Sequence, residues 1–132
     1  MSKRTRKQPE LLLGPLPVET INKTLEMELE AGEVVLSPAA QAHAARRHPV
    51  EYSRLLPHLD DIIADPLYIG DDHNNPGIEL VGRVHSLGTL ALVAVIVERD
   101  DKGRYHVVSF YPISDEKAQG RRQKGFLKIP KK

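Results

Sequence analysis

The first half of the chain places apolar residues at helical spacing. One stripe consists of Val18, Ile21, Leu25 and Leu29, and it predicts a helix that begins at Val18 and that Gly32 ends. Residues 1–17, ahead of this helix, finish in the breaker segment Leu13-Gly14-Pro15-Leu16-Pro17, which predicts a loose arm. A short β-like run over 34–36 follows the helix.

Two further helices are predicted before the pattern changes. Ser37 followed by Pro38 is typical of an N-cap with proline at the first helical position, so a helix begins there and runs to about Arg47. A third helix covers residues 51–63. It is interrupted near Pro57, because proline lacks the amide hydrogen that one helical hydrogen bond needs.

From residue 67 onward the pattern is that of strands. Apolar runs separated by polar turns predict strands at 67–69, 78–84, 90–97 and 105–111, with a polar turn over 71–77. The run 90–97 is almost wholly apolar, as expected of a central strand, and Pro112 ends the last strand. Helices followed by strands predict an α+β fold in which N-terminal helices pack on a four-stranded antiparallel sheet.

The domain organisation follows from these elements. We expect a flexible basic arm over 1–17, a single α+β domain over 18–116 and a basic C-terminal tail over 117–132. The tail holds a small apolar patch near Phe126 and Ile129 that could add an edge strand. The chain of 132 residues is long enough to bury a core without disulfides or metals.

Composition excludes several classes of protein. The chain has no cysteine, which excludes a disulfide scaffold, thiolate catalysis and any zinc site built on cysteine. Its longest apolar run, 90–97, is far shorter than the ~20 residues that cross a bilayer. Only three leucines follow the basic N-terminus before a breaker, too few for a signal peptide. We therefore expect a cytoplasmic protein with no membrane partner.

Charge is unevenly distributed along the chain. The formal net charge is +1, but the segment 11–116 carries eight basic and seventeen acidic residues. The two ends carry the excess of lysine and arginine, and the segment 117–132 holds seven basic residues and no acid. Basic ends on an acidic body would attract a polyanion through the ends. The alternative is that the ends only make the chain soluble.

The predicted helix 38–47 holds the first candidate chemistry. Arg46 and Arg47 each lie within roughly 60° of His43 on a helical wheel, whereas His48 falls about 140° away, in a last turn whose direction is not fixed. Imidazole and guanidinium groups on one side of a helix can bind a phosphate and move protons around it. The alternative is that His43 packs against the sheet and both arginines are solvated.

The predicted strand 105–111 holds the second set of candidate functional residues. Strand alternation puts Tyr105, Ser109 and Tyr111 on one face and the apolar Val108 and Phe110 on the other, which we assign to the core. Hydroxyl groups on an open sheet face can bind phosphate oxygens, and tyrosine rings can stack on bases. An ordinary half-solvated strand would show the same residues.

No metal or cofactor site is expected. The acidic groups Asp60-Asp61 with Asp65, and Asp71-Asp72 with His73, do not match the spacing of a known metal-binding loop. No phosphate loop, nucleophile elbow or metalloprotease motif is present. Ribonuclease chemistry remains open, because the RNA 2′-hydroxyl itself can attack and the protein need supply only a base, an acid and positive charge.

Four segments together resemble the phage-associated barnase–EndoU–colicin–RelE group of nucleases. They are VVLSPAAQAHAARRHP at 34–49, LPHLDDIIADPLYI at 56–69, LALVAVIV at 90–97 and YHVVSFYPIS at 105–114. The resemblance covers residues 33–114. It implies helices packed on an antiparallel sheet, and metal-independent RNA cleavage through a 2′,3′-cyclic phosphate. A neutralising protein or a phage structural protein is a possible partner.

Carried over position by position, the resemblance points to His43 and His48 on the helix, and we expect one of them to be the base and the other, or Tyr111, to be the acid. It also implies Ser109 and Tyr111 on the strand, with Arg47 as a phosphate contact. Two other readings stay open: a catalytically inactive module of the same fold that binds a partner, and a nucleic-acid-binding protein that works through its basic ends. The oligomeric state is not predicted.

Overall fold

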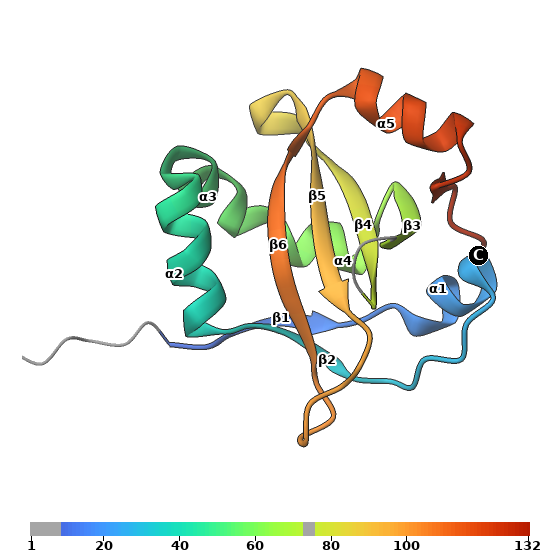
Figure 1. Cartoon of the computed structure of the whole chain (residues 1–132), viewed down its shortest axis with the longest axis horizontal. Coiled ribbons are helices and arrows are strands. Elements are labelled where there is room, and N and C mark those ends of the chain that lie inside the picture. The colour runs from blue at the N-terminus through green and yellow to red at the C-terminus, as the bar shows by residue number, and fades with distance from the viewer. Residues whose placement is uncertain (1–8, 73–75) are drawn as a thin grey trace, which may run out of the picture.

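The computed structural model describes residues 9–72 and 76–132, which form one sheet with helices on both of its faces (Figure 1). The helices are α1 (Val18–Leu25), α2 (Pro38–Arg47), α3 (Pro49–Leu55), α4 (Leu59–Ala64) and α5 (Asp115–Gln123). The strands are β1 (Leu11–Pro15), β2 (Glu33–Leu36), β3 (Tyr68–Asp72), β4 (Gly77–Val84), β5 (Thr89–Ile96), β6 (Tyr105–Ile113) and β7 (Leu127–Lys128). Two short 3₁₀ helices occupy Leu56–His58 and His85–Leu87.

The sheet of the described residues is seven-stranded, in the order β1-β2-β6-β5-β4-β3-β7. The four predicted strands, β3 to β6, are adjacent and antiparallel, as expected. The four-stranded, fully antiparallel sheet is nevertheless wrong in detail, because β1, β2 and β7 extend it and β2 runs parallel to β6. That parallel pair sets Val34 opposite Tyr105, and no local sequence signal predicts a pairing between such distant residues.

The prediction that residues 1–17 form a loose arm is wrong for residues 11–15, which form a strand. Leu11–Pro15 pairs with β2 as an edge strand, with Leu11 opposite Leu36. The side chains of Leu13 and Leu16 enter the core, whereas that of Leu12 is 66% exposed. This alternation gives the segment one apolar face to bury, and Gly14, at φ 92°, allows the irregular pairing there. Residues 1–8 of the predicted arm lie outside the described residues.

The first helix is shorter than predicted, since α1 ends at Leu25 rather than continuing through Leu29. Glu26 adopts a left-handed conformation with φ 56°. The side chain of Asn22 then fixes the departing chain, because it accepts a hydrogen bond from the amide of Leu29 at 2.8 Å and donates one to its carbonyl at 3.0 Å. Two bonds to one peptide segment replace the next helical turn.

The predicted third helix is interrupted at Pro57, as expected. Two other predictions are wrong: that Pro112 ends the last strand, and that residues 117–132 form only a tail. β6 continues through Pro112 to Ile113, which proline tolerates because no strand of the described residues pairs with the other side of this end of β6. The expected basic tail instead contains α5, capped by the hydroxyl of Ser114, which accepts from the amide of Lys117 at 3.1 Å. The edge strand expected near Phe126 is β7, which pairs with β3.

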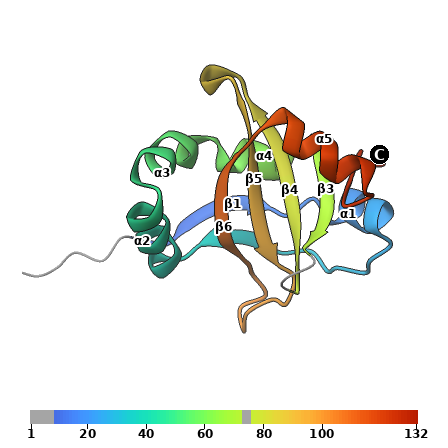
Figure 2. The ribbon, with the colours of Figure 1, turned by 45° about the horizontal axis from the view of Figure 1, so that its top comes forward.

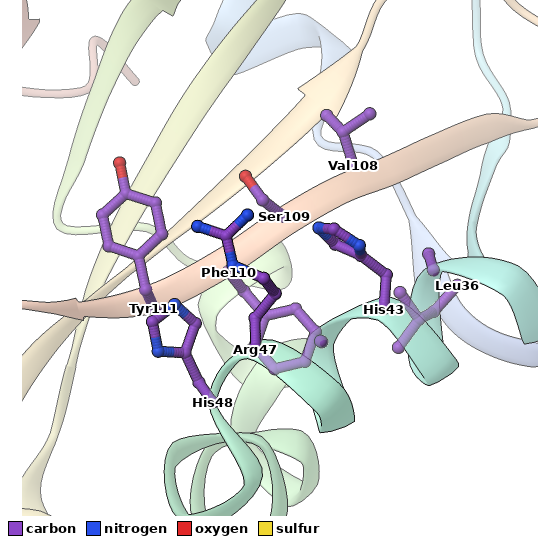
Figure 3. A pocket seen from close by; sticks show the side chains of 10 residues that line it. Leu36, His43, Arg47, His48, Val108, Ser109, Phe110 and Tyr111 are labelled. Atoms are coloured by element: carbon purple, nitrogen blue, oxygen red, sulfur yellow. The ribbon is translucent and has the colours of Figure 1, made fainter.

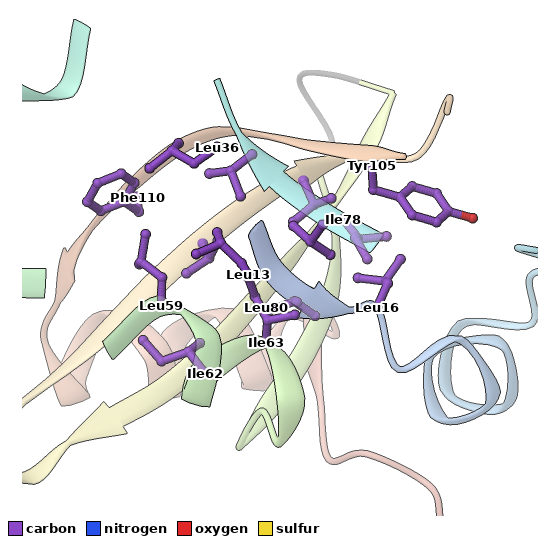
Figure 4. Packing of buried hydrophobic residues seen from close by; sticks show 14 of the residues in the cluster. Leu13, Leu16, Leu36, Leu59, Ile62, Ile63, Ile78, Leu80, Tyr105 and Phe110 are labelled. Carbon is purple, nitrogen blue, oxygen red and sulfur yellow. The ribbon is translucent and has the colours of Figure 1, made fainter. Parts of the chain in front are cut away.

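Each face of the sheet has its own apolar cluster. The larger one lies between the sheet and α4, and it includes Leu13, Leu36, Leu59, Ile62 and Phe110 (Figure 4). The smaller one lies on the other face beneath α5, where Ala118 packs with Leu90, Leu92 and Ala94 of β5. The alternating side chains of β5 thus contribute to both clusters, as expected of a central strand.

Asp100 closes the turn between β5 and β6. Its carboxylate accepts hydrogen bonds from the amides of Lys102 (2.9 Å) and Arg104 (3.0 Å) and from Arg104 Nε (3.1 Å), and it lies 2.7 Å from Nε2 of His106. The backbone hydrogen bond from Arg104, followed by the contact with His106, holds the pKa of Asp100 well below its ordinary 3.8. The ionised carboxylate therefore stabilises the turn.

Asp100→Asn is expected to lower the free energy of unfolding at neutral pH by removing that charge. Because the pKa of Asp100 is depressed in the folded state, its contribution is complete above pH 3.8 and declines as the pH falls below that value. Urea unfolding of both proteins should show a difference at neutral pH that shrinks at about pH 3. Asp101→Asn, which changes the neighbouring carboxylate, is the matched control. An equal difference at both pH values would contradict the assignment.

Candidate functional site

A groove of about 300 Å³ lies between α2 and the C-terminal half of β6 (Figure 3). It is lined by Leu36, Ala40, His43, Ala44, Arg47, His48, Val108, Ser109, Phe110 and Tyr111. One wall is therefore a helix that carries the basic side chains, and the other is a strand that carries hydroxyl groups. Among the described residues, β2 pairs with β6 only at Tyr105 and His106, so no described strand pairs with the edge of β6 beside α2.

The local sequence explains why α2 forms here. Ser37 accepts a hydrogen bond from the amide of Ala40 at 3.1 Å and Pro38 occupies the first turn, so the predicted N-cap is confirmed. Gln41 is buried, and its amide nitrogen donates to the carbonyls of Pro9 (2.8 Å) and Leu36 (3.1 Å). These two bonds fix α2 to the N-terminal segment and to the end of β2. No local sequence signal indicates this role of Gln41, because the role depends on where the N-terminal segment lies.

The other wall depends on a β-bulge in β6. Ala94 of β5 pairs with Ser109 and the next residue, Val95, pairs with Val107, so Val108 is one extra residue in β6. The bulge reverses the alternation between Val107 and Ser109. As a result Ser109 and Tyr111 share one face, while Phe110 lies on the same face as Tyr105 and joins the larger core cluster.

Tyr105 is consequently not in the groove, and its predicted position on one face with Ser109 is wrong. Its side chain is only 1% exposed, and its hydroxyl donates a hydrogen bond to the carbonyl of Glu30 at 2.5 Å. Burial raises the pKa of Tyr105, so the phenol stays protonated. An unbroken alternation predicted the wrong face, because a bulge of one residue moves every side chain beyond it to the opposite side.

Arg46 also lies outside the groove lining, although the sequence placed it near His43. The α2 residues of the groove occupy an arc that begins at His43 and extends about 100° toward Ala44, with Arg47 inside it. Arg46 falls about 60° on the other side of His43. The helical wheel therefore grouped two arginines that the packing of α2 against β6 separates.

His48 enters the groove because it ends the helix. Its amide still donates to the carbonyl of Ala44 at 2.9 Å, but its φ of −143° and ψ of 68° are not helical. Pro49 then begins α3. In Figure 3 the imidazole of His48 lies near Tyr111, and that of His43 lies near Val108 and Ser109. Oε1 of Glu51 lies 4.0 Å from Nδ1 of His48.

The structure thus brings together five of the seven predicted site residues: His43, Arg47, His48, Ser109 and Tyr111. In Figure 3 the guanidinium of Arg47 extends from α2 toward β6, between the two imidazoles. The groove also has apolar walls, from Ala40, Ala44 and Val108, which the sequence did not identify. Two proton-transferring groups on either side of a guanidinium can bind a phosphate diester and exchange protons with it.

Other site types receive no support from the described residues. Across 9–72 and 76–132, no three His, Cys, Asp or Glu side chains are arranged to hold a metal ion. His73, one of the candidate ligands that the sequence disfavoured, lies outside these ranges. Within the same ranges, every helix falls short of the length and apolar character needed to cross a membrane.

Comparison with known protein families gives a match over most of the chain. A family model described as phage-Barnase-EndoU-ColicinE5/D-RelE like nuclease 3 matches residues 13–119. The matched segment begins within β1 and ends within α5, so it contains both walls of the groove. No curated protein and no solved structure matches the chain.

Proposed function

This chain belongs to the phage-Barnase-EndoU-ColicinE5/D-RelE like nuclease 3 family, and we propose that within this nuclease family it is a metal-independent endoribonuclease. The observation that supports the proposal is the groove, where His43 and His48 lie on either side of Arg47. RNA carries its own nucleophile, the 2′-hydroxyl, so two histidines and one cation supply all the groups that this cleavage requires.

The proposed reaction is a transesterification. One histidine removes the proton of the 2′-hydroxyl, whose oxygen attacks the adjacent phosphorus. The bond from phosphorus to the 5′-oxygen breaks, and the other histidine protonates that leaving oxygen. The products are a 2′,3′-cyclic phosphate and a free 5′-hydroxyl. Either histidine can be the base, because both line the groove.

The remaining groove residues have roles in binding. Arg47 neutralises the charge that develops on the phosphoryl oxygens, for which a planar guanidinium offers paired donors. Ser109 donates a hydrogen bond to the same phosphate, and the ring of Tyr111 stacks on a neighbouring base. The hydroxyl of Tyr111 is the alternative proton donor if only one histidine acts in the reaction.

A chimeric oligonucleotide tests this mechanism directly. A DNA strand that contains one ribonucleotide offers a single 2′-hydroxyl, so cleavage is expected only on the 3′ side of that residue, with a cyclic phosphate end. Cleavage should be unchanged by EDTA. The all-DNA strand of the same sequence is the matched control. If the all-DNA strand is cut, or EDTA stops the reaction, the mechanism is wrong and the nuclease uses different chemistry.

A structured-RNA panel that includes tRNA covers the possibility that the chimera is a poor substrate. Cleavage of the panel but not of the chimera would mean that recognition requires RNA structure around the cut. If neither is cleaved at high protein concentration, the groove is a binding site and the chain is an inactive member of its family.

A further inference from the structure

A second hollow, of about 530 Å³, lies beside α5 and carries basic side chains that the proposed reaction does not use. Lys117, Arg121 and Lys124 line it. They are spaced four and three residues apart, so they share one side of α5 and span about 10 Å along its axis. The hollow also contains Asp72 and Glu79, which leaves basic groups in excess.

The cations of this hollow differ in their contacts. Arg121 forms an ion pair with Glu79 at 2.8 Å, which neutralises that carboxylate. Lys117 and Lys124 are exposed, and neither forms an ion pair with any other described residue. On the opposite side of α5, the guanidinium of Arg122 stacks over the ring of Tyr68 at 5.0 Å. The two lysines therefore remain available for an anionic ligand.

Strand register connects this hollow to the groove. Ser109 of β6 is opposite Ala94 of β5, and Ala94 is opposite Glu79 of β4. The three residues form one row across three adjacent strands on the same face of the sheet. Since neighbouring strands lie about 4.8 Å apart, Ser109 in the groove is roughly 10 Å from Glu79 in the hollow. Figure 2 shows α5 in front of the sheet, on the face to which this row belongs.

Basic side chains lie beside both ends of this row, as expected of a surface that binds a polyanion. The middle residue of the row, Ala94, is 4% exposed and belongs to the smaller apolar cluster, so a bound strand would pass over this covered position without contacting it. One end of the row lies beside Arg47 and His43, and the other lies beside Lys117 and Arg121. Single-stranded nucleic acids bind in grooves where basic side chains follow the phosphate backbone. Recognition of individual nucleotides in RNA likewise occurs mainly in single-stranded segments.

We propose that a single-stranded RNA with its scissile phosphate in the groove crosses the Ser109–Ala94–Glu79 row and binds Lys117 and Lys124 through phosphates beyond the cleavage site. This inference rests on the proposed function for the position of the scissile phosphate. It makes α5 a backbone-binding surface that increases affinity for longer strands without touching the reacting atoms. A dinucleotide, which is too short to reach α5, gains nothing from it.

Binding, measured apart from cleavage, tests this surface. The His43→Ala protein serves as the background, so that RNA remains intact, and fluorescence anisotropy follows a single-stranded RNA of ~12 nucleotides over a series of salt concentrations in EDTA. Lys117→Gln combined with Lys124→Gln is compared with Lys23→Gln combined with Lys102→Gln. The second pair removes the same charge from exposed sites on α1 and in the β5–β6 turn. Circular dichroism confirms that both proteins are folded.

Loss of two phosphate contacts should reduce the slope of log K against log salt by about 1.4, since each contact to a single strand contributes roughly 0.7. The α1 and turn variant should retain the slope of the background. On the otherwise wild-type protein, the α5 variant should raise KM for long RNA and leave dinucleotide cleavage unchanged. Equal slopes in the two double variants, or no RNA binding by the background protein, would overturn the proposal.

These outcomes separate the two proposals. If the α5 variant changes the slope but the wild-type protein cleaves no RNA, the surface is correct and the proposed function fails. If the wild-type protein cleaves RNA and the α5 variant binds and cleaves long strands normally, the proposed function stands and the surface is wrong.

Discussion

His43→Ala is expected to lower the rate of RNA cleavage by about 10²- to 10⁴-fold, the range over which general acid–base groups contribute. His43 projects from the middle of α2 into the groove, where it lies near Ser109. Alanine removes the proton-transferring group but preserves the helix, because alanine has the highest helix propensity. The rate should be measured at saturating RNA, with circular dichroism as a check on the fold.

The pH dependence provides a second readout for His43. With two histidines acting as acid and base, the wild-type rate should follow a bell-shaped curve between about pH 5 and 8, and the variant should lose one limb. His58→Ala is the matched control, because it removes a histidine that lies outside the groove. A His43→Ala protein with full activity, or a flat wild-type profile, would remove the histidines from the mechanism.

Phe110→Ala is expected to have the largest effect on stability, lowering the free energy of unfolding by about 3–5 kcal/mol. Phe110 is 5% exposed and belongs to the larger core cluster. Its ring also packs against Tyr52 of α3, with the ring centroids 6.0 Å apart. Removing the ring would leave a cavity beneath the groove and release α3 from β6. Urea unfolding followed by circular dichroism measures the change.

Val108→Ala is the comparison for Phe110, since Val108 lies two positions away on the same strand and its side chain is 43% exposed. Exposed side chains contribute little to the core, so this variant should change the free energy of unfolding by no more than about 0.5 kcal/mol. An equally small change in the free energy of unfolding for both variants would contradict the role of Phe110 as the link between the groove wall and the core. It would also mean that the bulge does not determine which side chains are buried.

The elements that the sequence predicted well have local signals. α2 follows from Ser37 and Pro38 at its start and Pro49 just after its end, and the structure confirms it. The central position of β5 follows from its continuous apolar run. His43, Arg47 and His48 could be selected for the site because all three belong to this well-predicted helix or to its end.

The elements that the sequence missed depend on distant contacts or have weak patterns. α5 buries only Ala118, so no apolar stripe marked it, although Ser114 followed by Asp115 and Glu116 is a usual helix start. The bulge at Val108 has no signature in the sequence, and it decided the positions of Ser109 and Tyr105. Whether Arg46 or Arg47 lines the groove depends on how α2 rotates against β6, which only the assembled core determines.

The parallel pairing of β2 with β6 has a consequence for when the groove can form during synthesis. The ribosome makes the chain from its N-terminus, and α2 emerges long before the segment that becomes β6. Contacts between such distant segments form slowly, because the loop between them must close first. The groove is therefore incomplete until residues 105–113 have been made and have joined β2. A nascent chain of this family member carries His43 and His48 but no second wall, so the proposed RNA cleavage would begin only late in translation.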